Sequence, residues 1–436
     1  IRFYKHSSKI NFLEGTDLDL EQELLIINKD INDNFSLSSE ILNRIEFPVL
    51  LAKRYSIQTG TNRFFEIRII DSIDEVTSSR GSIDGYINLL FDDIKQSKIN
   101  KISKEFDDNI FVLYKNSAQI RNEVLMILKF EKLIEKHHLD INALKLLDEE
   151  KSFHINNLKN LVLNQLFENN QNIWIYNGKK ETIQNKNRLY TRLSEICFKI
   201  YSETPIFINE LINKEFLSTP INTARKALFR ILIDQTQFEE LDFPEGKFPP
   251  EKAIYYSLLK NTHIHQKNGD IGYFKLDTPK DHSKLLGLWN KSEEFFDSAI
   301  SNKRNLGEFY EELSTKPFKL KKGFIDFWVP IFLIAKKEDY ALFHKDGSFI
   351  PFLSEDIIDL IHKKPLNFLV KSYDVSGLKL NLLESYKELV QIDTNNKGTQ
   401  STFLSIFGNF LKFQRGLNNY VLNTKKLSKS ALKLRA

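Results

Sequence analysis

Residues 323–335 read GFIDFWVPIFLIA and contain the longest apolar run of the chain, residues 327–335. This run is about half of the ~18 residues that a membrane span needs, so we expect a buried helix. A second helix is expected at 306–313 and a turn at 316–318. After the apolar helix, residues 340–343 and 348–351 flank Asp346-Gly347, a pair typical of β-hairpin turns. Two helices followed by a hairpin predict a winged-helix-like unit, which does not by itself imply DNA binding.

Further elements are expected on both sides of the apolar helix and its hairpin. A short helix (354–362) and a strand (368–373) complete the winged-helix-like unit. Towards the N-terminus, residues 64–70 and 110–114 are short, aromatic and β-branched and predict strands, whereas 82–90 fits a helix or a strand. Apolar residues three and four apart predict two or three helices over 117–168. Asn177-Gly178 predicts a hairpin at 173–183, and helices are expected at 186–201 and from about 219.

The expected fold class is mostly α with small β elements, in several domains, because 436 residues exceed one domain of roughly 100–200 residues. We predict five parts: an α/β part at 1–116, a helical segment ending in a β-hairpin at 117–184, a helical domain at 185–303, a winged-helix-like domain at 304–375, and a helical, basic C-terminal segment at 376–436.

Composition narrows the class of protein. Hydrophobic residues make up 41% and charged residues 28%, which suits a folded chain. A single cysteine, Cys197, excludes an internal disulfide and a multi-cysteine zinc site, and its place on an apolar helical stripe predicts a core role. No secretory signal pattern opens the chain, so we expect a cytoplasmic protein without a membrane span. The start at Ile1 without Met and the end inside an expected helix suggest a piece of a longer polypeptide.

Positive charge is concentrated at one end. Residues 394–436 hold eight Lys or Arg and no Asp or Glu, which leaves 54 basic and 58 acidic side chains elsewhere. With aromatic residues interleaved, this basic end fits contact with nucleic-acid phosphates. The alternative is an amphipathic helix whose lysines simply face water. The candidate nucleic-acid-binding residues are Lys412, Arg415, Lys425, Lys426, Lys429, Lys433 and Arg435.

Other chemistry has weaker support. Arg225 and Lys226, expected to be exposed on a helix, are weak candidates for contact with a phosphate or an acidic partner, and solubilising charge is the default interpretation. The pair His263 and His265 lacks an evident third ligand, so we expect no metal site.

Enzymatic motifs are also weak. Asp242 with Glu245-Gly246-Lys247 has the residue types of a Mg²⁺-dependent nuclease, but the spacing is too tight. The G-x-x-x-x-G-K-[ST] spacing is absent from the chain, so we expect no P-loop binding of ATP and assign no catalytic residue or cofactor to this segment.

Several spaced segments between residues 110 and 436 carry a family resemblance. They include 189–197 (LYTRLSEIC), Thr204-Pro205, 209–213 (NELIN), 224–226 (ARK), 248–253 (FPPEKA) and 424–428 (TKKLS). The chain resembles the region downstream of the P-loop in large bacterial ATPases of phage-defence islands, grouped with the BREX and phage-growth-limitation systems. It departs from that pattern at 219–223 (TPINT) and in lacking the phosphate loop.

This resemblance implies a non-catalytic scaffold portion of a defence ATPase that contacts DNA, other defence subunits or its own copies, with ATP and Mg²⁺ bound by the parent protein. A protein–protein interaction module without nucleic-acid contact remains open, and a nuclease is the least favoured alternative.

Overall fold

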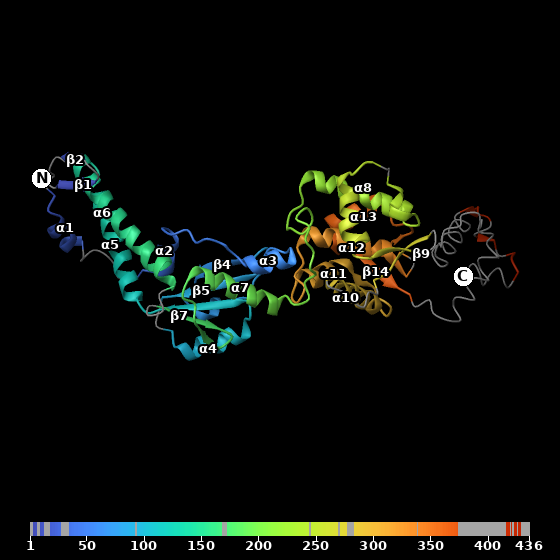
Figure 1. The fold of residues 1–436 in the computed structure, drawn as a ribbon, viewed down its shortest axis with the longest axis horizontal. Coiled ribbons are helices and arrows are strands. Elements are labelled where there is room, and N and C mark those ends of the chain that lie inside the picture. The colour runs from blue at the N-terminus through green and yellow to red at the C-terminus, as the bar shows by residue number, and fades with distance from the viewer. Residues whose placement is uncertain are drawn as a thin grey trace. The chain divides into compact units, whose positions relative to one another are not determined.

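The computed structural model describes most of residues 3–373 and a few residues near the C-terminus. The gaps are 7–8, 13–17, 28–34, 92–93, 168–171, 244–245, 269–270, 277–282 and 338, and beyond 373 the described residues are 416–418, 420, 423–424 and 426–428. Helices predominate, and the largest β element is a mixed sheet of six strands. The chain divides into two compact units (Figure 1): unit 1 is Ile1–Gln58 with Asn62–Ile200, and unit 2 is Thr59–Thr61 with Tyr201–Ala436.

The six-stranded sheet forms the centre of unit 1. Its strands lie in chain order, and the pairs β4–β5 and β5–β6 are parallel while the outer pairs are antiparallel. The strands are β3 (Leu50–Leu51), β4 (Phe64–Ile69), β5 (Gly85–Leu90), β6 (Asn109–Tyr114), β7 (Asn172–Tyr176) and β8 (Lys179–Glu181). The strands predicted at 64–70 and 110–114 are confirmed, and residues 85–90 form a strand rather than a helix.

Helices and one small hairpin complete unit 1. They are β1 (Phe3–His6), β2 (Lys9–Phe12), α1 (Leu20–Ile27), α2 (Leu37–Leu42), α3 (Lys53–Thr59), η1 (Ile73–Glu75), α4 (Gln96–Glu105), α5 (Ser117–Lys136), α6 (Ile141–Lys159), η2 (Asn160–Asn164), η3 (Gln165–Phe167) and α7 (Lys186–Ile200). The helices predicted over 117–168 are confirmed. The Asp140 carboxylate caps α6 by accepting from the backbone N–H groups of Asn142 and Ala143, both at 3.0 Å. The Tyr114 hydroxyl at the end of β6 donates to the Val162 carbonyl of η2 at 2.6 Å and so joins the segment after α6 to the sheet.

The predicted hairpin at Asn177-Gly178 is present, and it changes the expected division of the chain. Asn177 and Gly178 have φ of 48° and 74°, as a turn with left-handed residues requires. Because β7 pairs with β6, the hairpin extends the N-terminal sheet. Residues 117–184 are therefore part of unit 1 rather than a separate segment, and α7 also belongs to unit 1, whereas the sequence placed it in a helical domain at 185–303.

Unit 2 combines helices with two small sheets. Its elements are α8 (Thr219–Gln235), η4 (Glu239–Asp242), α9 (Pro250–Tyr255), η5 (Tyr256–Lys260), β9 (His265–Asn268), β10 (Ile271–Phe274), α10 (Leu285–Ser298), β11 (Arg304–Asn305), α11 (Leu306–Ser314), α12 (Lys322–Ala335), β12 (Tyr340–His344), β13 (Phe349–Ile350), α13 (Glu355–Lys363), η6 (Pro365–Asn367) and β14 (Phe368–Ser372).

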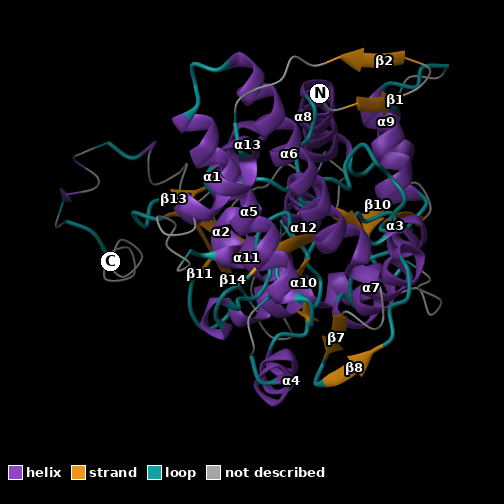
Figure 2. Cartoon of the chain, turned by 90° about the vertical axis from the view of Figure 1, so that its left-hand side faces the viewer, coloured by secondary structure: helices purple, strands orange, loops and turns teal. Residues whose placement is uncertain are grey.

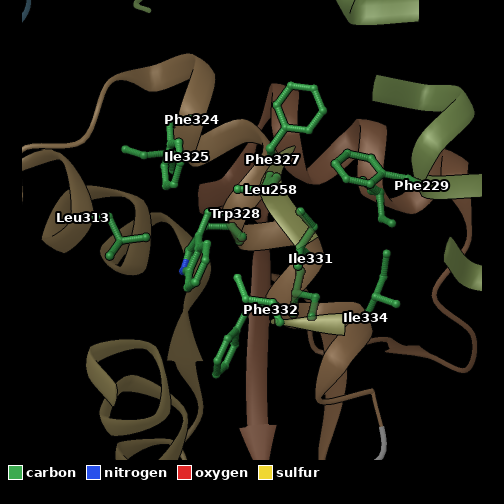
Figure 3. Packing of buried hydrophobic residues seen from close by; sticks show 14 of the residues in the cluster. Phe229, Leu258, Leu313, Phe324, Ile325, Phe327, Trp328, Ile331, Phe332 and Ile334 are labelled. Carbon is green, nitrogen blue, oxygen red and sulfur yellow. The ribbon is translucent and has the colours of Figure 1, made fainter. Parts of the chain in front are cut away.

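Helix α12 is the centre of the unit 2 core. Every residue from Gly323 to Ile334 is buried, as predicted for this apolar segment. Figure 3 shows Trp328, Phe332 and their neighbours interleaved with side chains from surrounding elements. The Trp328 indole N–H donates to the Ser292 hydroxyl of α10 at 2.9 Å, which satisfies the one polar group of this buried ring.

The hairpin predicted after α12 is also present. Phe343 pairs with Phe349 and Leu342 with Ile350, and Gly347 has φ of 89° in the turn. Strand β14 lies between β11 and β12 in a sheet of order β11-β14-β12-β13. The helix immediately before the hairpin, α12, is enclosed in the core and does not present a face for DNA. The winged-helix-like architecture of 304–375 remains a prediction.

Candidate functional site

Arg225 lies on the buried face of α8, which corrects the expectation that it is exposed. The buried stripe of this helix consists of Ile221, Ala224, Arg225, Leu228, Phe229 and Leu232, so position 225 follows the apolar spacing of three and four. The Arg225 side chain is only 3% exposed, whereas its neighbour Lys226 remains 45% exposed. Burial of a guanidinium requires a counter-charge, and α13 supplies one.

The counter-charge is Asp359 on α13. Its Oδ1 lies 3.5 Å from Arg225 Nη2, and its Oδ2 lies 3.2 Å from Lys226 Nζ and 2.8 Å from Lys363 Nζ. The two residues predicted as phosphate or partner contacts thus meet one carboxylate of their own unit. Asp359 lies on a capped helix: the Ser354 hydroxyl accepts from the Ile357 N–H at 3.3 Å and caps the N-terminus of α13.

A second carboxylate, Asp326 of α12, lies in the same cluster. Its Oδ1 is 2.9 Å from Nδ1 of His362 on α13, and the Asp326 side chain is 4% exposed. The Tyr310 hydroxyl of α11 is buried near Arg225 and Asp326, and it has no hydrogen-bond partner among the described residues. We call Arg225, Tyr310, Asp326, Asp359 and His362 the charged cluster of unit 2.

The electrostatics of the charged cluster follow from burial. Burial lowers the pKa of Arg225, against the influence of Asp326 and Asp359, and burial raises the pKa of the Tyr310 hydroxyl. Burial also acts to raise the pKa of Asp359, but hydrogen bonds from Lys363 and Lys226 outweigh it, and the net pKa is lowered. Asp359 therefore stays ionised at neutral pH.

The charged cluster is suited to holding helices together. It joins α8, α11, α12 and α13 through groups that face one another. A nucleophilic site would pair a hydroxyl or thiol with the Asp326–His362 dyad, and no described hydroxyl or thiol hydrogen-bonds to His362. A structural role is the chemistry that these contacts support.

Most of the basic end lies outside the described residues. This applies to Lys412, Arg415, Lys425, Lys429, Lys433 and Arg435. Lys426 is described and exposed, and its backbone N–H donates to the Thr424 hydroxyl at 3.3 Å. The proposed phosphate contacts therefore remain a prediction from sequence.

A rigid loop before α8 exposes apolar side chains. Ile208, Leu211 and Phe216 are 74%, 43% and 80% exposed. The loop is held by the buried Asn213 amide, which donates to the Gly60 carbonyl (3.0 Å), the Thr61 hydroxyl (2.9 Å) and the Phe207 carbonyl (3.0 Å). It is also fixed to the start of α12, because the Gly323 N–H donates to the Lys214 carbonyl at 2.9 Å.

The two histidines of the pair His263 and His265 lie in different surroundings. His265 is buried, with one ring nitrogen 2.8 Å from the Tyr255 hydroxyl and the other 2.8 Å from the Thr236 carbonyl, so both nitrogens are engaged. His263 is exposed at φ 58°. Among the residues described, no group of three or more His, Cys, Asp or Glu could hold a metal ion, and Glu245 lies outside them.

Within the described part of the chain, none of the helices combines the length and apolar character that crossing a bilayer requires.

The acidic half of the charged cluster, Asp326 and Asp359, was not predicted from the sequence. Asp326 stands alone in an otherwise apolar segment, and such a residue signals a buried partner. Asp359 gave no comparable signal, because it lies on an amphipathic helix with charged neighbours.

Comparisons with known proteins give no family: no protein-family model, no curated protein and no solved structure matches the chain.

Proposed function

We propose that the chain is a non-catalytic scaffold portion of a bacterial anti-phage defence ATPase, which contacts DNA or partner subunits through its basic end. The proposed contact of the basic end with DNA or partner subunits rests on its charge: residues 394–436 contain eight basic and no acidic residues. The spaced motifs described above, among them 189–197 and 209–213, support the defence ATPase.

The charged cluster supports a scaffold role for the folded part. Arg225 is buried against Asp359, and the exposed Lys226 and Lys363 contact the same carboxylate, which supports a role of these cations in the fold of unit 2. The basic end, in contrast, contains no acidic side chain that could neutralise it locally. In this proposal ATP and Mg²⁺ belong to the parent protein, which is cytoplasmic.

The finer architecture is part of the same proposal. We propose that 304–375 is a winged-helix-like domain, on the support of the order α11, α12, β12, β13. Because α12 is buried, this domain serves assembly rather than groove recognition.

A protein–protein interaction module is the second candidate, and the exposed loop favours it. Ile208, Leu211 and Phe216 are held towards solvent by a loop that Asn213 and Gly323 fix in place. Exposed apolar groups on a rigid support are typical of docking surfaces.

One triple variant separates the two candidates. Changing Lys425, Lys426 and Lys429 together to Glu abolishes the duplex DNA binding of the basic end if that end meets phosphates. If the chain is only an interaction module, DNA affinity is negligible in the unaltered chain at low salt, and the same variant loses assembly in a pull-down of the parent complex.

A further inference from the structure

Five lysines gather on one part of unit 1, where α4 meets the β7–β8 hairpin. Lys95, Lys98, Lys101 and Lys104 follow one another along α4. Lys180 of β8 pairs with Ile175, which belongs to the same core cluster as Ile99 of α4, so Lys180 lies on the α4 face of the sheet, whereas Lys179 points to the opposite face. All five are exposed, and none of them forms an ion pair with any residue that the structure describes. Figures 1 and 2 both place α4 beside β7. We call these five residues the α4 lysine surface.

The surface is held rigidly by contacts at the hairpin turn. The Gly178 N–H donates to the buried Ser103 hydroxyl of α4 at 2.8 Å. A Cβ at position 178 would lie 2.3 Å from Lys104 Cε, so the Lys104 stem lies directly on the turn. On the other face of α4, Ile99 is fully buried against the core that contains Ile175 of β7. The helix and the hairpin therefore present their lysines in a fixed arrangement.

The lysines at the start of α4 are placed where they reduce its stability. Side chains three apart on a helix are neighbours, at about 5–6 Å between Cβ atoms, so this run brings like charges together. Lys95 is the N-cap residue, the first turn has no acidic residue, and no side chain caps the helix. Cations at a helix N-terminus oppose the helix dipole, whereas Lys104 lies in the last turn, where a cation is favourable. Folding alone therefore does not favour Lys95 and Lys98 at the start of the helix.

Among the described residues, no neighbouring acid forms an ion pair with the surface, and Asp92 and Asp93 lie outside the described part of the chain. Glu105 follows Lys101 by four residues, yet no ion pair joins them among the described contacts. Glu181, at the end of β8, is engaged by Arg192 at 2.6 Å. Lysines on the edge strand β8 also discourage pairing with another chain, but that reason does not extend to the four on α4.

We infer that the α4 lysine surface binds the phosphate backbone of duplex DNA. Nine residues of helix span about 14 Å, over which duplex DNA presents several phosphates, since it carries one charge per ~1.7 Å of axis. No aromatic side chain of α4 or of the β7–β8 hairpin is among the exposed large hydrophobic residues of the described chain. Single-strand binding relies on stacking of bases on such rings, so a duplex is the better fit. This site is independent of the basic end.

The test uses the full chain and a labelled 20-base-pair duplex of random sequence at two salt concentrations. Lys98→Glu, Lys101→Glu and Lys104→Glu are introduced together, with Lys145→Glu, Lys199→Glu and Lys322→Glu as the control. The control residues are exposed lysines of α6, α7 and α12 that have no described ion pair, so the change in net charge is identical. Removing three phosphate contacts lowers the slope of log K against log salt by about 3 and weakens binding at least tenfold at low salt. A thermal melt verifies that the fold is retained, since Lys98→Glu in the first turn of α4 favours the helix and Lys104→Glu in the last turn opposes it.

Each outcome decides the inference. Tenfold or greater loss in the α4 variant, with little change in the control, supports it. Unchanged binding, or equal loss in both variants, overturns it. If a polyglutamate peptide of equal charge binds this surface as tightly as the duplex, the surface is a docking site for an acidic protein and the DNA assignment is wrong. The variant with Lys425, Lys426 and Lys429 changed to Glu is measured alongside. If only this variant loses duplex affinity, the proposed function stands and the α4 site is wrong. If only the α4 variant loses affinity, the α4 site stands and DNA contact by the basic end is wrong.

Discussion

Arg63 and Asp84 form a fully buried ion pair at the amino ends of strands β4 and β5. Arg63 Nη1 donates to Asp84 Oδ1 at 2.9 Å, and both side chains are 0% exposed. The other carboxylate oxygen accepts from the Phe64 backbone N–H at 2.9 Å. The pair thus fixes the register at which two parallel strands begin.

Asp84→Asn removes one charge of this pair and leaves the Arg63 guanidinium buried. We expect unit 1 to lose about 3–5 kcal/mol of unfolding free energy, because an uncompensated buried charge is costly. Urea denaturation followed by circular dichroism measures this loss. Asp148→Asn, which breaks the exposed pair with Lys151, is the control and costs less than about 1 kcal/mol. A loss of that small size at Asp84 would contradict the account.

The turn of the β12–β13 hairpin needs glycine at position 347. Gly347 has φ of 89°, and a Cβ there would meet nothing within 4 Å, so the penalty is conformational alone. Gly347→Val should cost about 1–2 kcal/mol in a urea titration, because a β-branched residue resists positive φ. Gly287→Ala in α10 is the matched control, since its φ is not positive and alanine favours helix. Equal effects at the two positions would refute the turn assignment.

Asp359 makes the stability of unit 2 dependent on acid. Its pKa is lowered in the fold, so its contribution is complete above the unfolded value of about 4 and is lost as the pH falls through the folded value. Asp359→Asn should lower the melting temperature at pH 7, and the difference from the unaltered chain should shrink towards pH 2. Asp297→Asn, at an exposed position of α10, should change neither melt. A deficit that is the same at pH 7 and pH 2 would argue against the charge interaction.

The 436-residue chain should not hydrolyse ATP. A phosphate-cradling loop is missing from its sequence, so we expect no phosphate release above background in a clean preparation. Turnover that a substitution within this chain abolishes would overturn the non-catalytic assignment.

Local chemistry explains what could be predicted from the sequence. The pairs Asn177-Gly178 and Asp346-Gly347 predict turns because few residue types other than Asn and Gly accept the positive φ found at Asn177, Gly178 and Gly347. The burial of α12 follows from its composition. Pairings between distant segments were not predicted: β14 lies between β11 and β12, and nothing in residues 368–372 specifies those neighbours. Arg225 was predicted to be exposed because charged side chains usually lie at the surface, although position 225 falls on the apolar stripe of α8. Its partner Asp359 is far along the chain and only the fold brings them together.

The salt dependence of duplex DNA binding tests the central proposal most directly. If four to six residues of the basic end meet phosphates, this end should contribute about −4 to −5 to the slope of log K against log salt, with little sequence preference. Changing Lys425, Lys426 and Lys429 to Glu should abolish the contribution of the basic end to this binding and leave the thermal melt unchanged. Negligible affinity of the unaltered chain for duplex DNA at low salt, or a salt slope that the triple variant does not alter, would contradict the account.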